Sequence, residues 1–166
     1  YVMKNVFSKL GIRSDVLSKA KKEILSKCVG GKWVGLHYRV YPSSHGEDRL
    51  LFSDYLGILS RFVDKGFCLY VSGNNLSAVP DLGGFEDVIV STNGFALDFA
   101  VLTLVDNLII STGTFAYFAG VYNKDANASH DVYYYEGAKL LFGFSPVRVE
   151  VSWISWSKTD VFFRRP

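Results

Sequence analysis

The 166-residue chain lacks several features that mark particular protein classes. It has only two cysteines and no Cys-x-x-Cys pair, which excludes the common zinc modules and the disulfide-rich scaffolds. Its formal net charge is only +2, and its largest basic cluster spans residues 19–22, so we expect no nucleic-acid partner. The most hydrophobic region, residues 95–122, is interrupted by Asp98 and Asp106, so we expect no membrane span within the chain.

Common signatures of nucleotide-dependent and hydrolytic enzymes are also missing. The sequence contains no GxxxxGK[ST] phosphate loop, no GxGxxG turn, no serine nucleophile elbow and no Asp-x-Asp metal pair. The sequence therefore does not favour an ATPase, a dinucleotide-dependent dehydrogenase or an α/β-hydrolase.

The composition is that of a globular domain. Hydrophobic residues make up 49% of the chain and charged residues 20%, so it can bury a core and is too apolar to be disordered. We expect one domain over residues 1–166. Because the first residue is Tyr1 rather than methionine, we also expect this domain to be a fragment of a longer chain.

The cysteines and two short motifs bear on the compartment. Cys28 falls at the end of a predicted helix and Cys68 in a predicted buried strand. We expect both to be small buried hydrophobic side chains, with a disulfide as the less favoured alternative. The triplets at residues 75–77 and 127–129 match the N-glycosylation sequon, which permits an origin in the secretory pathway without requiring it.

Short apolar runs alternate with stretches of helical periodicity along the chain. The pattern predicts strands over residues 33–38, 67–71, 88–90, 108–110 and 132–135, and helices over residues 14–29, 50–65, 95–105 and 114–121. Residues 147–156 alternate in the manner of a further strand. This order predicts an α/β fold with a Rossmann-like parallel sheet and helices on both faces.

Polar groups follow two of these strands at the end where α/β sheets hold ligands. Arg39 comes directly after the first strand, where its guanidinium could bind phosphate oxygens or form a structural salt bridge. His37 alternates with Arg39 and so points to the same face, where it could contact a ribose or phosphate or be a satisfied core residue.

Ser111 and the Thr112-Gly113-Thr114 turn come between another strand and a helix. Free backbone N–H groups and the positive end of the helix dipole make such a turn an anion site. Gly113 would allow close approach of the backbone to a ligand. The alternative is a simple threonine N-cap.

Three further side chains could take part in binding or catalysis. Asp98 lies among apolar residues, and burial of its carboxylate requires a partner. That partner could be backbone N–H groups, or a ligand with two adjacent donors such as guanine. Glu47 and His45, in the loop after Arg39, could accept a proton or could simply be solvated.

These segments resemble a known family. Residues 34–40, VGLHYRV, resemble the His-x-Arg-Arg stretch of the α1,2- and α1,6-fucosyltransferases and the related protein O-fucosyltransferases. Residues 69–75, LYVSGNN, are similar to their next strand, which commonly ends in Ser-Asp-Asp. Residues 96–102 and 107–119 are similar to the Asp-Phe-Ala-Leu-Leu and Ser/Thr-x-Gly/Ser-Thr-Phe-x-x-Trp-x-Ala segments of the α1,2 family. The order and spacing of these segments agree with those of the family, and the similarity covers roughly residues 10–145.

The resemblance implies the donor half of a GT-B-like glycosyltransferase that transfers fucose from GDP-fucose to a glycan hydroxyl, with inversion and without metal or cofactor. Arg39 would contact the β-phosphate, Asp98 would recognise guanine, and Glu47 would match the base of the α1,6 relatives. The donor-binding residues would be His37, Arg39, Asp98, Ser111, Thr112, Gly113, Thr114 and Phe115, and the catalytic residues Arg39 and Glu47.

The resemblance also implies partners and leaves alternatives open. A glycan acceptor and an N-terminal acceptor-binding half are expected, in the Golgi lumen for a eukaryotic member or the cytoplasm for a bacterial or viral one. The chain departs from the family where Val40 replaces the second arginine and Pro42 an acidic residue. A catalytically inactive module that binds a nucleotide sugar or serves as an interaction domain therefore remains an alternative, as does an unrelated flavodoxin-like or nucleotide-binding domain.

Overall fold

The computed structural model describes residues 11–40, 50–111, 113–135 and 154–156. Within them, six strands pair in parallel throughout, in the order β3-β2-β1-β4-β5-β6. The strands are β1 (Lys32–Tyr38), β2 (Phe67–Gly73), β3 (Val88–Val90), β4 (Asn107–Ile110), β5 (Asp131–Tyr135) and β6 (Ile154–Trp156). The helices are α2 (Ser14–Glu23), α3 (Phe52–Leu59), α4 (Phe95–Leu104) and α5 (Thr114–Ala126), with 3-10 turns η1 (Leu25–Lys27) and η3 (Leu76–Ala78).

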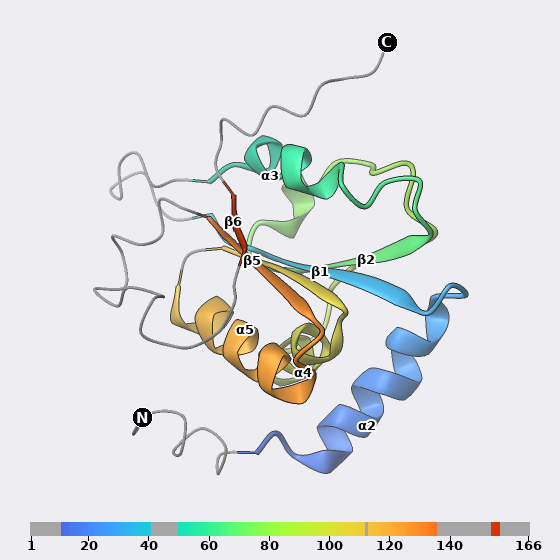
Figure 1. Ribbon diagram of the computed structural model, residues 1–166, viewed down its shortest axis with the longest axis vertical. Coiled ribbons are helices and arrows are strands. Elements are labelled where there is room, and N and C mark those ends of the chain that lie inside the picture. The colour runs from blue at the N-terminus through green and yellow to red at the C-terminus, as the bar shows by residue number, and fades with distance from the viewer. Residues whose placement is uncertain (1–10, 41–49, 112, 136–153, 157–166) are drawn as a thin grey trace.

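The helices cover both faces of the sheet (Figure 1). Helices α2, α4 and α5 pack on one face and α3 on the other, so two hydrophobic clusters form, one on each side. Strand β1 is buried at every position but its first, which explains its nearly continuous apolar sequence. The predicted Rossmann-like parallel sheet with helices on both faces is confirmed.

Alternation along β1 decides which side chains meet which helices. Val34, Leu36 and Tyr38 belong to the cluster under α3, whereas Trp33 belongs to the cluster under α4 and α5. His37 has the same parity as Trp33, so it points toward α4 and α5.

The strand order reverses beside β1. The chain runs from β1 outward to β2 and β3, and then returns to β4 on the other side of β1. In open α/β sheets ligands bind at this topological switch point, outside the carboxyl ends of the two strands where the order reverses. Those ends are Tyr38 of β1 and Ile110 of β4.

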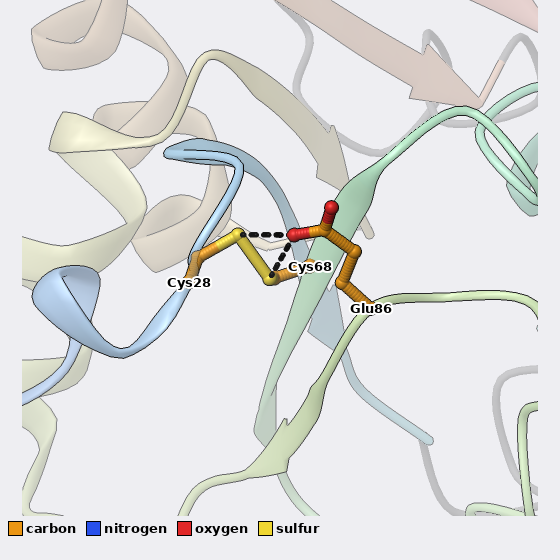
Figure 2. A group of neighbouring side chains, drawn as sticks. All are labelled: Cys28, Cys68 and Glu86. Atoms are coloured by element: carbon orange, nitrogen blue, oxygen red, sulfur yellow. Dashed lines mark hydrogen bonds between the residues drawn. A yellow bond between two sulfur atoms is a disulfide. The ribbon is translucent and has the colours of Figure 1, made fainter.

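The structure corrects the expectation for the cysteines. Cys28 and Cys68 form a disulfide, with their Cα atoms 5.9 Å apart (Figure 2). Cys28 precedes β1 and Cys68 is the second residue of β2, and the parallel pairing of Trp33 with Cys68 brings the two together. The sequence separation of 40 residues hides this proximity, which only the register of the two strands creates.

Most of the predicted elements are present with shifted ends. The first predicted helix stops at Glu23 and continues only as η1, and the second stops at Leu59. Helix α5 extends five residues beyond its predicted end at Val121. The last three residues of the predicted tail strand form β6, and the rest of it lies outside the described residues. Among the described residues, no helix is long and apolar enough to cross a membrane.

Candidate functional site

A buried pair of polar side chains occupies the switch point. His37 Nδ1 lies 2.6 Å from Ser111 Oγ, and the two residues are only 5% and 1% exposed. The imidazole also packs against the ring of Phe115, with 5.1 Å between the ring centroids. Burial, reinforced by the positive charge of Arg39, lowers the pKa of His37 to about 4. His37 is therefore neutral at physiological pH and can both donate and accept a hydrogen bond.

The turn after β4 leads directly into α5. Gly113 precedes the helix with a φ of 118°, a conformation that glycine adopts far more readily than other residues. The first N–H groups of an α-helix lack partners within the helix, so this turn presents donors at the positive end of the helix dipole. Thr114 begins the helix and is exposed, whereas Thr112 lies outside the described residues.

Arg39 is exposed and follows β1, so its guanidinium lies at the same edge of the sheet. The backbone next to it is held by Asn74, whose side chain accepts from Val40 N at 2.7 Å and donates to Val40 O at 3.0 Å. Asn74 N also donates to Tyr38 O at 3.0 Å. These three bonds extend the β1–β2 pairing past its end and position Arg39.

Asp98 is buried in the first turn of α4, as expected, but its partners are side chains rather than backbone N–H groups. Its Oδ1 accepts from Tyr70 Oη at 2.7 Å and from Ser91 Oγ at 2.5 Å. Asn93 completes the network by donating through Nδ2 to Tyr70 and through its backbone N to Ser91. The other oxygen, Oδ2, makes no hydrogen bond within the described part of the chain.

Burial raises the pKa of Tyr70 to about 12, and the hydrogen bond to Asp98 acts in the same direction. The tyrosine hydroxyl therefore stays protonated and remains a donor to the carboxylate. Tyr70 could not be predicted from the sequence as a polar partner, because its position in the middle of an apolar strand indicates a core residue.

Most of the predicted site residues meet at one edge of the sheet. Six of them surround the carboxyl ends of β1 and β4, namely His37, Arg39, Ser111, Gly113, Thr114 and Phe115. Asp98 lies at the amino end of α4, on the face of the sheet to which His37 points. Glu47 and His45 lie outside the described residues, so their predicted roles stay predictions.

An apolar hollow adjoins this group. It has a volume of about 430 Å³ and is lined mainly by aromatic side chains of α4 and α5. Phe115 connects it to the switch point, because its ring contacts His37 on one side and Phe99 on the other. The hollow is lined by Gly11, Ile12, Phe99, Thr114, Phe115, Phe118 and Tyr122.

The fold and the site define an α/β domain of the Rossmann type with a polar, buried switch point. No protein-family model matches the sequence, and no curated protein matches it significantly. Among solved structures, the chain is similar to POFUT1 in complex with GDP, with 13% sequence identity and a TM-score of 0.47. The match covers 73% of this chain and 46% of the POFUT1 chain, so this chain spans less than half the length of that protein.

Proposed function

We propose that this chain is the donor-binding domain of a glycosyltransferase, and that its donor is a nucleoside-diphosphate sugar, GDP-fucose. The observation that carries the proposal is the meeting of the His37–Ser111 pair with the start of α5 at the switch point of the sheet. The resemblance of the strand-end segments to the fucosyltransferases supports the choice of donor.

The diphosphate is the part of the donor that these residues fit best. Departure of the sugar from a nucleoside diphosphate leaves negative charge on the β-phosphate. Arg39 and the N–H groups at the start of α5 would neutralise that charge without a metal. Neutral His37 would donate to a phosphate oxygen, or would donate to or accept from a ribose hydroxyl, while Ser111 holds the ring in place.

Asp98 is the proposed recognition group for the base. Guanine offers two adjacent N–H donors to a carboxylate, and Oδ1 of Asp98 is already occupied by two hydroxyl donors. Oδ2 would therefore receive the base, and the bonds from Tyr70 and Ser91 would set the orientation of the carboxylate.

Calorimetric titration tests donor binding. GDP and GDP-fucose should bind, UDP and FMN should bind much more weakly, and Arg39→Ala should weaken GDP binding about 10- to 100-fold through loss of a charge-assisted phosphate contact. Arg13→Ala is the matched control, because Arg13 is an exposed arginine paired with Asp15 near the start of α2. If GDP neither binds nor raises the unfolding temperature, the proposal is wrong.

Turnover separates the enzyme from an inactive binding module. Release of GDP from GDP-fucose, alone or with a glycan acceptor, should be detectable and should fall in Glu47→Gln with little change in GDP affinity. Binding without any turnover, in the presence of the acceptor half as well, would favour the inactive module.

A further inference from the structure

One sequon lies far from the candidate site, in the connection between α5 and β5. Asn127, Ala128 and Ser129 are all exposed. The connection joins the carboxyl end of a crossover helix to the amino end of the next parallel strand, so it lies at the edge of the sheet opposite the switch point. A bulky group attached there would touch neither the sheet nor the candidate site.

The hydrogen bonds of this turn leave the amide nitrogen of Asn127 available. Its Oδ1 accepts from Ser129 N at 3.0 Å and from Ser129 Oγ at 2.8 Å. Its Nδ2 donates to none of the described residues. The turn itself is held by backbone bonds, from Asn127 N to Asn123 O and from His130 N to Asn127 O. Substitution at Nδ2 therefore breaks no bond that holds the turn.

The disulfide is a second, independent observation. Cys28 and Cys68, which Figure 2 shows joined, are 5% and 0% exposed, so their bond is shielded from reductants and acts as a structural tether. Structural disulfides form in oxidising compartments such as the lumen of the endoplasmic reticulum and are rare in the cytosol. In that same lumen, Asn-x-Ser triplets receive N-linked glycans.

We infer that Asn127 is an N-glycosylation site and that the chain matures in the lumen where its disulfide forms. The co-substrate is an oligosaccharide linked to a lipid through pyrophosphate. Nδ2 of Asn127 forms a bond to C1 of the first sugar and loses one proton to a base of the transferring enzyme. The C1–O bond breaks at the same time, and the lipid pyrophosphate leaves with its electron pair.

The other sequon, at Asn75, has a different setting, and the inference does not extend to it. Asn75 is also exposed, but it adopts a left-handed conformation with a φ of 55°. It follows β2 at the carboxyl edge of the sheet, next to the Asn74 that holds the backbone beside Arg39. A glycan there would stand beside the candidate site.

The test is expression of the chain behind a secretion leader in eukaryotic cells, followed by peptide mapping of lysate and medium before and after peptide-N-glycosidase. Asn127 should carry a glycan and should become aspartate when the glycan is released. Ser129→Ala should abolish this modification, and Ser129→Thr should retain it because threonine also completes the sequon. Because glycans are attached to the nascent chain, even variants that fold poorly show whether Asn127 can be glycosylated.

An unmodified Asn127 in chains whose Cys28 and Cys68 resist alkylation under denaturing conditions would overturn the inference, since the disulfide shows that such chains have passed through the oxidising lumen. Free thiols at both cysteines in the secreted chain would overturn the argument from the disulfide. Neither result depends on GDP binding, so the inference and the proposed function fail separately.

Discussion

His37 Nδ1 lies 2.6 Å from Ser111 Oγ, which joins the carboxyl end of β1 to the residue that follows β4. The two strands are neighbours on opposite sides of the point where the strand order reverses. The bond therefore spans the place where a Rossmann-type sheet holds its ligand, and it fixes the plane of a buried, neutral imidazole.

The buried His37 should make stability depend on pH. The pKa of His37 is lowered from 6.5 in the unfolded chain to about 4 in the folded one, so the unfolded state binds the proton more readily. Protonation of His37 then costs no stability above about pH 6.5. The free energy of unfolding falls as the pH drops toward 4, by about 3 kcal/mol at pH 4. Urea unfolding at pH 7 and pH 4 should show this loss, and His37→Gln should reduce it by about that amount.

His130 is the matched control for this experiment. Its pKa is also lowered by burial, but it lies between α5 and β5, away from the switch point. In His130→Gln the larger part of the loss of stability between pH 7 and pH 4 should remain. An unchanged loss in His37→Gln would contradict the assignment to His37.

Asn74 should matter for both stability and GDP binding. Asn74→Ala removes both side-chain bonds to Val40, which we expect to lower the free energy of unfolding by about 1–2 kcal/mol. Because these bonds hold the backbone next to Arg39, GDP binding measured by calorimetry should weaken several-fold. Retention of full GDP affinity would show that Arg39 is positioned without Asn74.

Gly73 should tolerate no side chain. A Cβ there would lie 1.7 Å from Tyr38 O, and the residue has a φ of 136°. Gly73→Ala should therefore destabilise the fold by several kcal/mol or prevent folding. Gly83→Ala is the matched control because nothing lies within 4 Å of its Cβ position. Thermal unfolding of the two variants should differ sharply, and equal stability would contradict the close approach of β1 and β2.

The Cys28–Cys68 disulfide should contribute strongly to stability. It closes a loop with a sequence separation of 40 residues, for which the chain-entropy relation gives about 4 kcal/mol. The double variant Cys28→Ser/Cys68→Ser should lose about this much in denaturant unfolding. GDP affinity of the molecules that remain folded should not change, because the disulfide lies near the amino ends of β1 and β2. A double variant as stable as the wild type would show that the bond does not constrain the chain.

Tyr70 and Ser91 should act together on Asp98. Tyr70→Phe removes one donor to a buried carboxylate and should lower the free energy of unfolding by about 1.5–3 kcal/mol. Ser91→Ala removes the other donor. Because both hydroxyls bind the same oxygen, the double variant should show an interaction energy of at least about 0.5 kcal/mol in a double-mutant cycle. Strict additivity would contradict a shared network.

The order of elements and the class of fold could be predicted from local patterns. The buried strands have nearly continuous apolar sequences, and the first two helices show helical periodicity, so the existence of these elements follows from local patterns in the sequence. Helix ends were less predictable. Helix α2 stops at Glu23 although apolar residues continue, because the chain tightens into η1 before it enters β1.

The places of the candidate site residues in the fold could be predicted, but their hydrogen-bond partners could not. His37, Asp98 and Ser111 stand out in the sequence because they are polar residues at strand ends or among apolar residues. That His37 meets Ser111, and that Asp98 meets Tyr70, depends on contacts between segments 74 and 28 residues apart.

The sequence by itself therefore determined a parallel α/β domain with polar groups at the ends of two strands, because periodicity and turn residues act over a few neighbouring positions. Only the tertiary structure decided the strand order, the His37–Ser111 bond, the hydroxyl partners of Asp98 and the Cys28–Cys68 disulfide. These depend on register and helix packing, which bring distant segments together through the burial of apolar surface that no short stretch of sequence contains.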